Sequence, residues 1–182
     1  MRINVRFAGA GGQGVIMASV LLAKGYGLGE NYNISQTQSY GPEARGGACK
    51  AEVVISDEEI DYMKVDMADV FVAMNQAGFD KYIKMVKRGA IVLVNSTLVD
   101  AENPDYYAVP ATDIAEKMGK PFTVNMVMLG ALTKLVPKIH FDTVEEEIRK
   151  AFIPKIAEIN IEAYRKGYDR TAEALEKERK IV

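Results

Sequence analysis

A glycine-rich turn near the start of the sequence has the residue types and spacing of an anion-binding site. The run Gly9-Ala10-Gly11-Gly12-Gln13-Gly14 fits G-x-G-x-x-G and lies between an alternating apolar segment at 3–7 and a long apolar segment at 15–23. Glycines let the backbone turn tightly and bring its N–H groups against a ligand, and the N-terminus of a following helix favours an anion. The order of strand, turn and helix therefore indicates contact with a phosphate or a carboxylate.

The turn alone leaves three interpretations open. A dinucleotide site needs an Asp or Glu about twenty residues later, at the end of the second strand, to hold the ribose. That strand is expected to end at Thr37-Gln38-Ser39, where there is no carboxylate, and Glu30 comes too early. In the second interpretation the glycines only let strand and helix pack closely. In the third, the turn contacts an anion or a partner protein and needs no ribose carboxylate.

A second loop carries most of the other residues expected at this site. They are Ser39, Tyr40, Gly41, Glu43, Arg45, Gly46 and Gly47. Pro42 fixes its own φ, and the Gly46-Gly47 pair permits backbone angles that other residues rarely adopt. The side chains of Glu43 and Arg45 are therefore expected to have fixed directions. Ligands of open α/β sheets gather at the carboxyl ends of strands, so we expect both loops to lie side by side there. Arg45 is the cation expected to face the anion.

Asn75 and Asn95 close two further predicted strands at the same edge. For both residues a role as polar lining of the site and a role in forming the turn remain open. We include Asn75 among the ligand- or partner-binding candidates and assign no catalytic residue and no metal ligand to this chain.

The elements that must position these loops alternate between strand and helix. Strands are expected at 3–7, 33–37, 50–56, 70–73 and 90–94, and helices at 15–23, 79–86, 125–135, 143–152 and 155–177. This alternation predicts an α/β fold: a Rossmann-like three-layer domain with a mainly parallel sheet and a helical C-terminal third. Thr143 and Glu146 have the spacing of a capping box. The charged residues after Asp169 are expected to form a solvated helix end.

Length and composition indicate an ordinary globular protein. The 182 residues are expected to form a single domain, and 48% of them are apolar and 26% charged. A net charge of −2 gives no sign of nucleic acid or an anionic membrane as partner. The sequence has no apolar run of about eighteen residues and no signal peptide pattern, which predicts a cytoplasmic protein.

The two residues best suited to metals or nucleophilic chemistry occur once each. A single cysteine, Cys49, excludes ligation of an iron–sulfur cluster by four cysteines of this chain, and a single histidine, His140, leaves no set for structural zinc. We expect Cys49 to be a small buried residue and His140 to be a surface or helix-capping residue.

The motifs resemble those of one known family. F-A-G-A-G-G-Q-G-V at 7–15 and S-Q-T-Q-S-Y-G-P-E-A-R-G-G at 35–47 resemble the gamma subunit of the 2-oxoacid:ferredoxin oxidoreductases. A-D-V-F-V-A-M-N-Q at 68–76 and V-N-M-V-M-L-G-A-L at 124–132 extend the resemblance over about residues 3–165. The form R-G-G-A-C-K-A-E-V-V at 45–54 looks closer to the 2-oxoglutarate enzymes than to the pyruvate enzymes. Ketoisovalerate and indolepyruvate enzymes remain alternatives.

The resemblance implies one component of a larger, CoA-acylating oxidoreductase. In that family, thiamine diphosphate and Mg²⁺ lie between alpha and beta subunits, 4Fe-4S clusters carry electrons, coenzyme A takes the acyl group and ferredoxin accepts the electrons. The expected partners are alpha and beta subunits and a ferredoxin-like delta subunit. This chain alone is expected to bind no cofactor, and it also lacks a G-D-G…N segment for thiamine diphosphate. A stand-alone nucleotide-binding dehydrogenase and a purely structural interaction domain are the rival functions.

Overall fold

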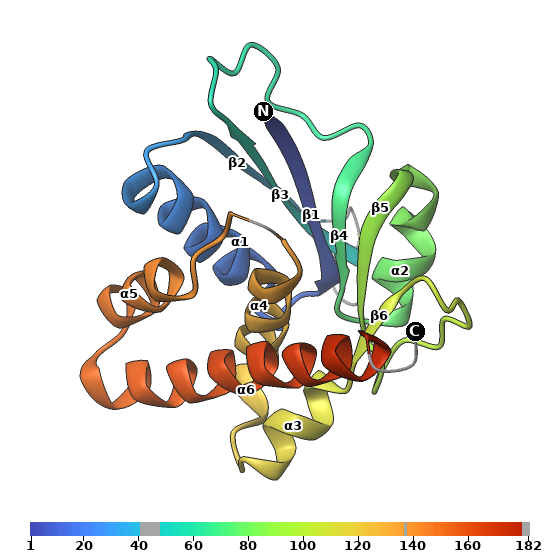
Figure 1. Cartoon of the computed structure of the whole chain (residues 1–182), viewed down its shortest axis with the longest axis vertical. Coiled ribbons are helices and arrows are strands. Elements are labelled where there is room, and N and C mark those ends of the chain that lie inside the picture. The colour runs from blue at the N-terminus through green and yellow to red at the C-terminus, as the bar shows by residue number, and fades with distance from the viewer. Residues whose placement is uncertain (41–47, 137, 180–182) are drawn as a thin grey trace.

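One six-stranded sheet organises the chain, as seen in a computed structural model that describes residues 1–40, 48–136 and 138–179 (Figure 1). The strands are β1 (Arg2–Ala10), β2 (Asn33–Ser39), β3 (Ala48–Ser56), β4 (Ala68–Ala73), β5 (Val86–Asn95) and β6 (Tyr107–Val109). Their order in the sheet is β2-β3-β1-β4-β5-β6. The pairs β1–β4, β4–β5 and β5–β6 are parallel, whereas β3 is antiparallel to both neighbours.

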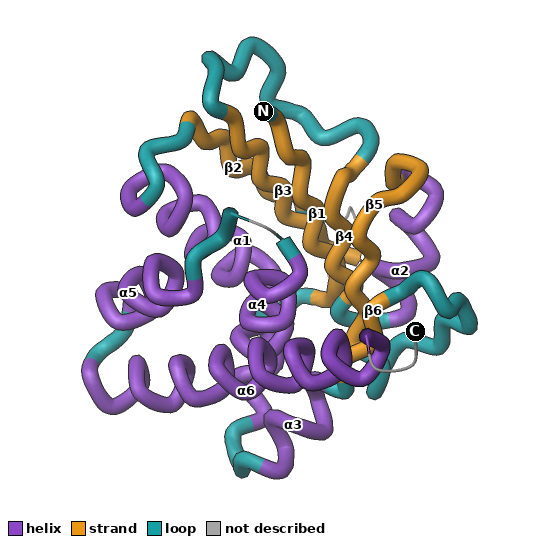
Figure 2. Tube along the Cα trace, in the orientation of Figure 1, coloured by secondary structure: helices purple, strands orange, loops and turns teal. Residues whose placement is uncertain are grey.

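Helices cover both faces of this sheet, which confirms the predicted three-layer α/β fold (Figure 2). The α-helices are α1 (Val15–Lys24), α2 (Gln76–Tyr82), α3 (Ala111–Lys117), α4 (Val124–Leu135), α5 (Phe141–Ala151) and α6 (Pro154–Arg179). A π-helical turn, η1 (Gly25–Gly29), extends α1, and short 3₁₀ turns lie at η2 (Ile83–Met85) and η3 (Pro121–Thr123). The helices α1, α4, α5 and α6 lie on one side of the sheet and α2 on the other.

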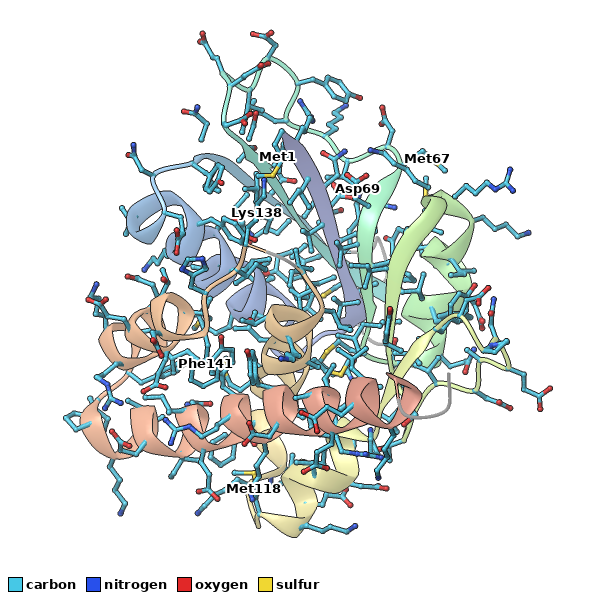
Figure 3. The ribbon with its side chains drawn as sticks, in the orientation of Figure 1. Met1, Met67, Asp69, Met118, Lys138 and Phe141 are labelled. Atoms are coloured by element: carbon cyan, nitrogen blue, oxygen red, sulfur yellow. The ribbon has the colours of Figure 1, made fainter. Side chains whose placement is uncertain are left out.

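The larger core lies on the side of α1 and α4. Val5 and Phe7 of β1 point into it, and nine of the twelve residues of α4 are buried, as its apolar sequence predicts. Helix α6 crosses α4 at very short range, because Gly130 and Gly167 each face backbone atoms of the other helix and leave no room for a Cβ. Phe141 stacks on Tyr164 between α5 and α6, with ring centroids 4.7 Å apart (Figure 3).

One sequence expectation about the helical third is wrong. Helix α5 begins at Phe141 with His140 as its N-cap, so Thr143 lies inside the first turn and forms no capping box. The Thr143 hydroxyl donates instead to Glu30 Oε1 at 3.0 Å, a tertiary contact that local spacing does not reveal. Helix α6 continues to Arg179, and in its charged end Glu173, Glu176 and Lys177 are exposed while Thr171 is buried.

Different residues lie at the two ends of the parallel strands. Met1, Asp69 and Lys138 lie at the amino-terminal edge of the parallel strands (Figure 3). The glycine-rich turn follows the carboxyl end of β1 at the opposite edge. In the described ranges no helix is long and apolar enough to cross a membrane.

Candidate functional site

The glycine-rich turn is braced by one of its own side chains. Strand β1 extends through Ala10, and the Gln13 N–H donates to the Ala10 carbonyl at 3.2 Å. The Gln13 side chain accepts from the Ala10 N–H at 2.7 Å and donates to the Met74 carbonyl at 3.5 Å. Gln13 thus links the end of β1 to the residue after β4. Its predicted contact with a ligand or partner stays a prediction.

The four glycines of the turn fall into two kinds. A Cβ on Gly9 would meet Gln13, Met74 and Val15 within 3 Å, and one on Gly14 would overlap Asn125. A Cβ on Gly11 or Gly12 would meet none of the described residues within 4 Å. The packing interpretation of the motif therefore holds for Gly9 and Gly14, while Gly11 and Gly12 face open space.

The backbone of the turn is left with free donors. Among the described residues, the N–H groups of Gly11, Gly12 and Gly14 have no hydrogen-bond acceptor. Gly14 is the N-cap of α1 with φ of 74°, and it offers no side chain to cap the helix. The first turn of α1 also contains no acidic residue. The positive end of the helix is thus uncompensated at the point where the exposed glycines begin, which suits an anion.

Of the two strands that flank the second loop, β3 lies beside β1 and β2 does not, whereas the sequence suggested that the loops after β1 and β2 lie side by side. Ser39 at the end of β2 pairs with Lys50 of β3, and Lys50 in turn pairs with Ala8 of β1. The ends of β1 and β2 are therefore one strand apart. Where the second loop rejoins the sheet, however, Ala48 pairs directly with Ala10 beside the glycine turn.

Two candidates from the second loop are placed by the structure. Ser39 ends β2 and Tyr40, which follows it, is 66% exposed. The remaining candidates, Gly41, Glu43, Arg45, Gly46 and Gly47, lie outside the described residues.

The two asparagines have the turn-forming role. Asn75 is the N-cap of α2, and its side chain accepts from the Gly78 N–H at 2.9 Å. Asn95 is fully buried and accepts from the Ala111 N–H at 3.1 Å while its amide donates to the Met74 carbonyl at 3.1 Å. Asn95 therefore does not line the site. The partly exposed Asn75 follows β4, the direct neighbour of the strand that leads into the glycine turn.

Comparison with known proteins identifies the family. Residues 4–170 match the family described as pyruvate ferredoxin/flavodoxin oxidoreductase. The chain belongs to this family.

Relatives within the oxidoreductase family match the chain almost end to end. The 2-oxoglutarate synthase subunit KorC of Methanocaldococcus jannaschii is 44% identical over 93% of this chain and 94% of that protein. The crystal structure of a keto/oxoacid ferredoxin oxidoreductase gamma subunit from Geobacter sulfurreducens PCA superposes with a TM-score of 0.85 and 33% identity, covering 96% of this chain and 98% of the other. The predicted gamma-subunit resemblance is confirmed.

A third relative shows the same fold inside a longer polypeptide. It is the 2-oxoglutarate:ferredoxin oxidoreductase of Magnetococcus marinus with 2-oxoglutarate, coenzyme A and succinyl-CoA bound. The TM-score is 0.82 at 25% identity, and the match covers 94% of this chain but 31% of that one. Within the family this domain thus occurs both as a separate subunit and as part of a larger chain, and other subunits are implied.

The lone cysteine and the lone histidine of this oxidoreductase subunit have different surroundings. Cys49 is 5% exposed, and burial raises the pKa of its thiol. His140 has an exposed side chain whose Nδ1 lies 3.2 Å from Glu30 Oε1. The part of the chain that the structure describes contains no group of three His, Cys, Asp or Glu side chains placed to share a metal ion.

Sequence reasoning missed one residue beside the turn. Asn125 near the start of α4 is 5% exposed, and its amide donates to the Gly14 carbonyl at 3.2 Å. Its Oδ1 is buried and has no hydrogen-bond partner among the described residues. The signal was present in the sequence, because Asn125 is a lone amide in the apolar run V-N-M-V-M-L.

Proposed function

We propose that residues 1–182 form one gamma-type subunit of a 2-oxoglutarate:ferredoxin oxidoreductase, with the cytoplasm as its location. The complex would convert 2-oxoglutarate, CoA and oxidised ferredoxin to succinyl-CoA, carbon dioxide and reduced ferredoxin. Four relatives called 2-oxoglutarate synthase subunit KorC are 39–44% identical to this chain. Ketoisovalerate, pyruvate and indolepyruvate relatives are 35%, 33% and 27% identical. These identities favour 2-oxoglutarate as the substrate.

The proposal divides the work between this chain and its partners. The partners we propose are alpha and beta subunits and a ferredoxin-like delta subunit. Thiamine diphosphate with Mg²⁺ would stabilise the carbanion left by decarboxylation, and 4Fe-4S clusters would carry the electrons, both held by these partners. The lone thiol of this chain is buried at Cys49 and cannot supply a cluster with its ligands.

The contribution of this chain rests on one observation, the uncapped and outward-facing turn before α1. In the described part of the chain, no group accepts from the N–H groups of Gly11 and Gly12, and nothing lies within 4 Å of a Cβ built on either residue. We propose that the turn holds an anionic group, either a phosphate of CoA or a carboxylate of the substrate or of a partner subunit. Arg45 in the second loop would add the positive side chain, as its position in the sequence suggests.

Substituting Gly11 tests this proposal without disturbing the fold. In Gly11→Asp, a carboxylate would stand where the anion is expected, and the open surroundings give no reason for the chain to unfold. Gly11→Ala is the matched control, because it adds a Cβ without a charge. In the complex reconstituted with its partners, we expect the Asp variant to lose about ten- to hundredfold in kcat/KM, equivalent to one charge-assisted contact.

The kinetics should be measured for CoA and for 2-oxoglutarate separately, with Arg45→Ala and Arg45→Lys beside the Gly11 variants. A defect for one substrate assigns the anion to that substrate, and a defect in assembly alone assigns it to a partner. Arg45→Lys should restore only part of the activity if the contact is bidentate. Full activity of Gly11→Asp in an intact complex would refute the role of the turn.

The rival dehydrogenase function makes an opposite prediction for the isolated chain. The end of β2 carries Gln38 and Ser39 in place of a ribose-binding carboxylate. We therefore expect NAD(H) to bind no more tightly than about 1 mM, or roughly −4 kcal/mol. Micromolar binding in calorimetry would support the dehydrogenase instead.

A further inference from the structure

A cavity of about 400 Å³ with several charged residues in its lining lies beside β2 and β3, on the side of the sheet opposite α1 and α4. Its walls come from three strands, from the segment between β3 and β4, and from η2. The charged residues that line it are Arg6, Lys50, Glu52, Lys64 and Asp66. The glycine-rich turn takes no part in it, so the cavity is separate from the turn on which the proposed function rests.

The base of the cavity is a buried ion pair. Arg6 is 1% exposed and Glu52 5%, and the two residues face each other across β1 and β3. Arg6 Nε lies 2.7 Å from Glu52 Oε1. The rest of the Arg6 guanidinium donates to the carbonyls of Met85 and Val65. Arg6 is therefore occupied in holding the two segments that close the cavity.

A second cation shares the same carboxylate. Lys50 Nζ lies 2.9 Å from Glu52 Oε1, and its side chain is 27% exposed. Both Lys50 and Arg6 also lie against the ring of Tyr82, at 5.9 and 5.5 Å from its centroid. One carboxylate thus serves two cations in a partly desolvated site, where an unbalanced charge is costly.

The charge of the whole lining is not balanced either. Its described residues include three cationic side chains and two carboxylates, which leaves one positive charge in excess among them. Asp66 accepts from the Tyr62 hydroxyl, and among the described residues neither Asp66 nor Lys64 forms an ion pair. The ammonium group of Lys50 has three N–H donors, and among the described residues it donates to one acceptor, Glu52 Oε1.

Neutral donors stand beside these lysines. Thr37 and Ser39 of β2 pair with Glu52 and Lys50 of β3, so their side chains lie on the same face of the sheet. Both residues line the cavity. Its volume is within the range of small-molecule sites, roughly 300–1,000 Å³.

We propose that this cavity is a binding site for a small carboxylate anion, with Lys50 as its main contact and Lys64 as the second cation. A monoanion balances the single excess charge. A dianion would leave an excess negative charge near Glu52 and Asp66, so a carboxylate fits better than sulfate or doubly charged phosphate.

Titration of the full-length, ¹⁵N-labelled chain tests the site. Acetate and sulfate would be added at constant ionic strength while amide resonances are followed by NMR. We expect acetate to give saturable shifts at Ser39, Lys50 and Lys64, with weaker binding of sulfate. Lys50→Gln should weaken acetate binding about tenfold or more, because it removes one charge-assisted contact. Lys155→Gln, which alters an exposed lysine at the start of α6, is the control.

A second variant reverses the expected sign. Glu52→Gln keeps an oxygen that accepts from Arg6 but removes a negative charge, so acetate should bind more tightly. Shifts that do not saturate, equal losses in the Lys50 and Lys155 variants, or tighter binding of sulfate than of acetate would each overturn the proposal. None of these results depends on the oxidoreductase activity of the complex.

Discussion

Two regions on opposite faces of the sheet are built on different principles, although both faces also carry apolar side chains. On the face toward α1 and α4, β1 contributes Val5 and Phe7 to a continuous apolar core. On the opposite face, the residue between them, Arg6, is just as deeply buried but is paired with Glu52. Adjacent residues of one strand thus pack into an apolar core on one side and into a buried ion pair on the other.

The difference shows what each face depends on. The apolar face is stabilised by close packing, which tolerates exchange of one apolar side chain for another of similar volume. The region of Arg6 and Glu52 on the other face, called the charged face below, depends on complete pairing, because removing one partner leaves the other charged, buried and uncompensated. The same new side chain should therefore have very different effects on the two faces.

The largest effect is expected from Arg6→Met. It leaves the buried Glu52 with Lys50 alone and removes the donors to the Val65 and Met85 carbonyls. Losing one partner of a buried pair costs about 3–5 kcal/mol of unfolding free energy. Leu21→Met, at a fully buried position of α1 in the apolar core on the other side of the sheet, should cost less than about 1.5 kcal/mol. Urea unfolding of both variants makes the comparison.

A double variant then separates the charge from the other contacts of Arg6. In Arg6→Met with Glu52→Leu, the unpaired carboxylate is gone, so much of the lost stability should return. The carbonyls of Val65 and Met85 still lack their donor, so the recovery should be incomplete. A double variant no more stable than Arg6→Met would show that the ion pair is not the source of the effect.

A smaller effect is expected from Gly130→Ala. The added methyl would strike the backbone of α6 at Tyr164, so α4 and α6 must move apart. Overpacking of this kind costs about 1–3 kcal/mol. Gly11→Ala adds the same methyl in open space and should change stability by less than about 0.5 kcal/mol. Equal melting temperatures for the two variants would contradict the close helix contact.

Sequence patterns predicted the apolar core beside α1 and α4 well and the charged region around Arg6 poorly. The alternation of Ile3, Val5 and Phe7 and the long apolar run of α4 predicted elements that bury those residues, because apolar periodicity reports burial directly. The same alternation marks Arg6 as polar but does not tell whether its face is covered. Its burial depends on Tyr82 and on the segment around Val65, which are distant in the sequence.

The antiparallel direction of β3 relative to β2 could also have been predicted from the sequence. Strands β2 and β3 have no predicted helix between them, and parallel neighbours need a crossover connection of a dozen or more residues. Because no crossover helix is predicted between β2 and β3, the two strands are expected to be antiparallel. At the site, the sequence predicted the turn of Gly11 and Gly12. The lone amide of Asn125 in an apolar run was also visible in the sequence, but its partner, Gly14, is far away in the chain and could not be predicted from it.

The smallest expected effect compares two neighbours on β3, Cys49 and Lys50. Cys49 points into the apolar core and Lys50 into the charged cavity. Burial raises the pKa of the Cys49 thiol, so the folded protein keeps the proton above pH 8.5 or so, where an unfolded thiol begins to lose it. The free energy of unfolding should therefore fall slightly as the pH rises through that range, and Cys49→Ala should remove this part of the slope, whereas Lys50→Gln should not. Iodoacetamide should also label Cys49 far more slowly in the folded protein than in urea, because the thiolate is the reactive form. Rapid labelling of the folded chain at pH 8 would show that this end of β3 opens, and that the apolar face is less well packed beside the glycine turn than its burial indicates.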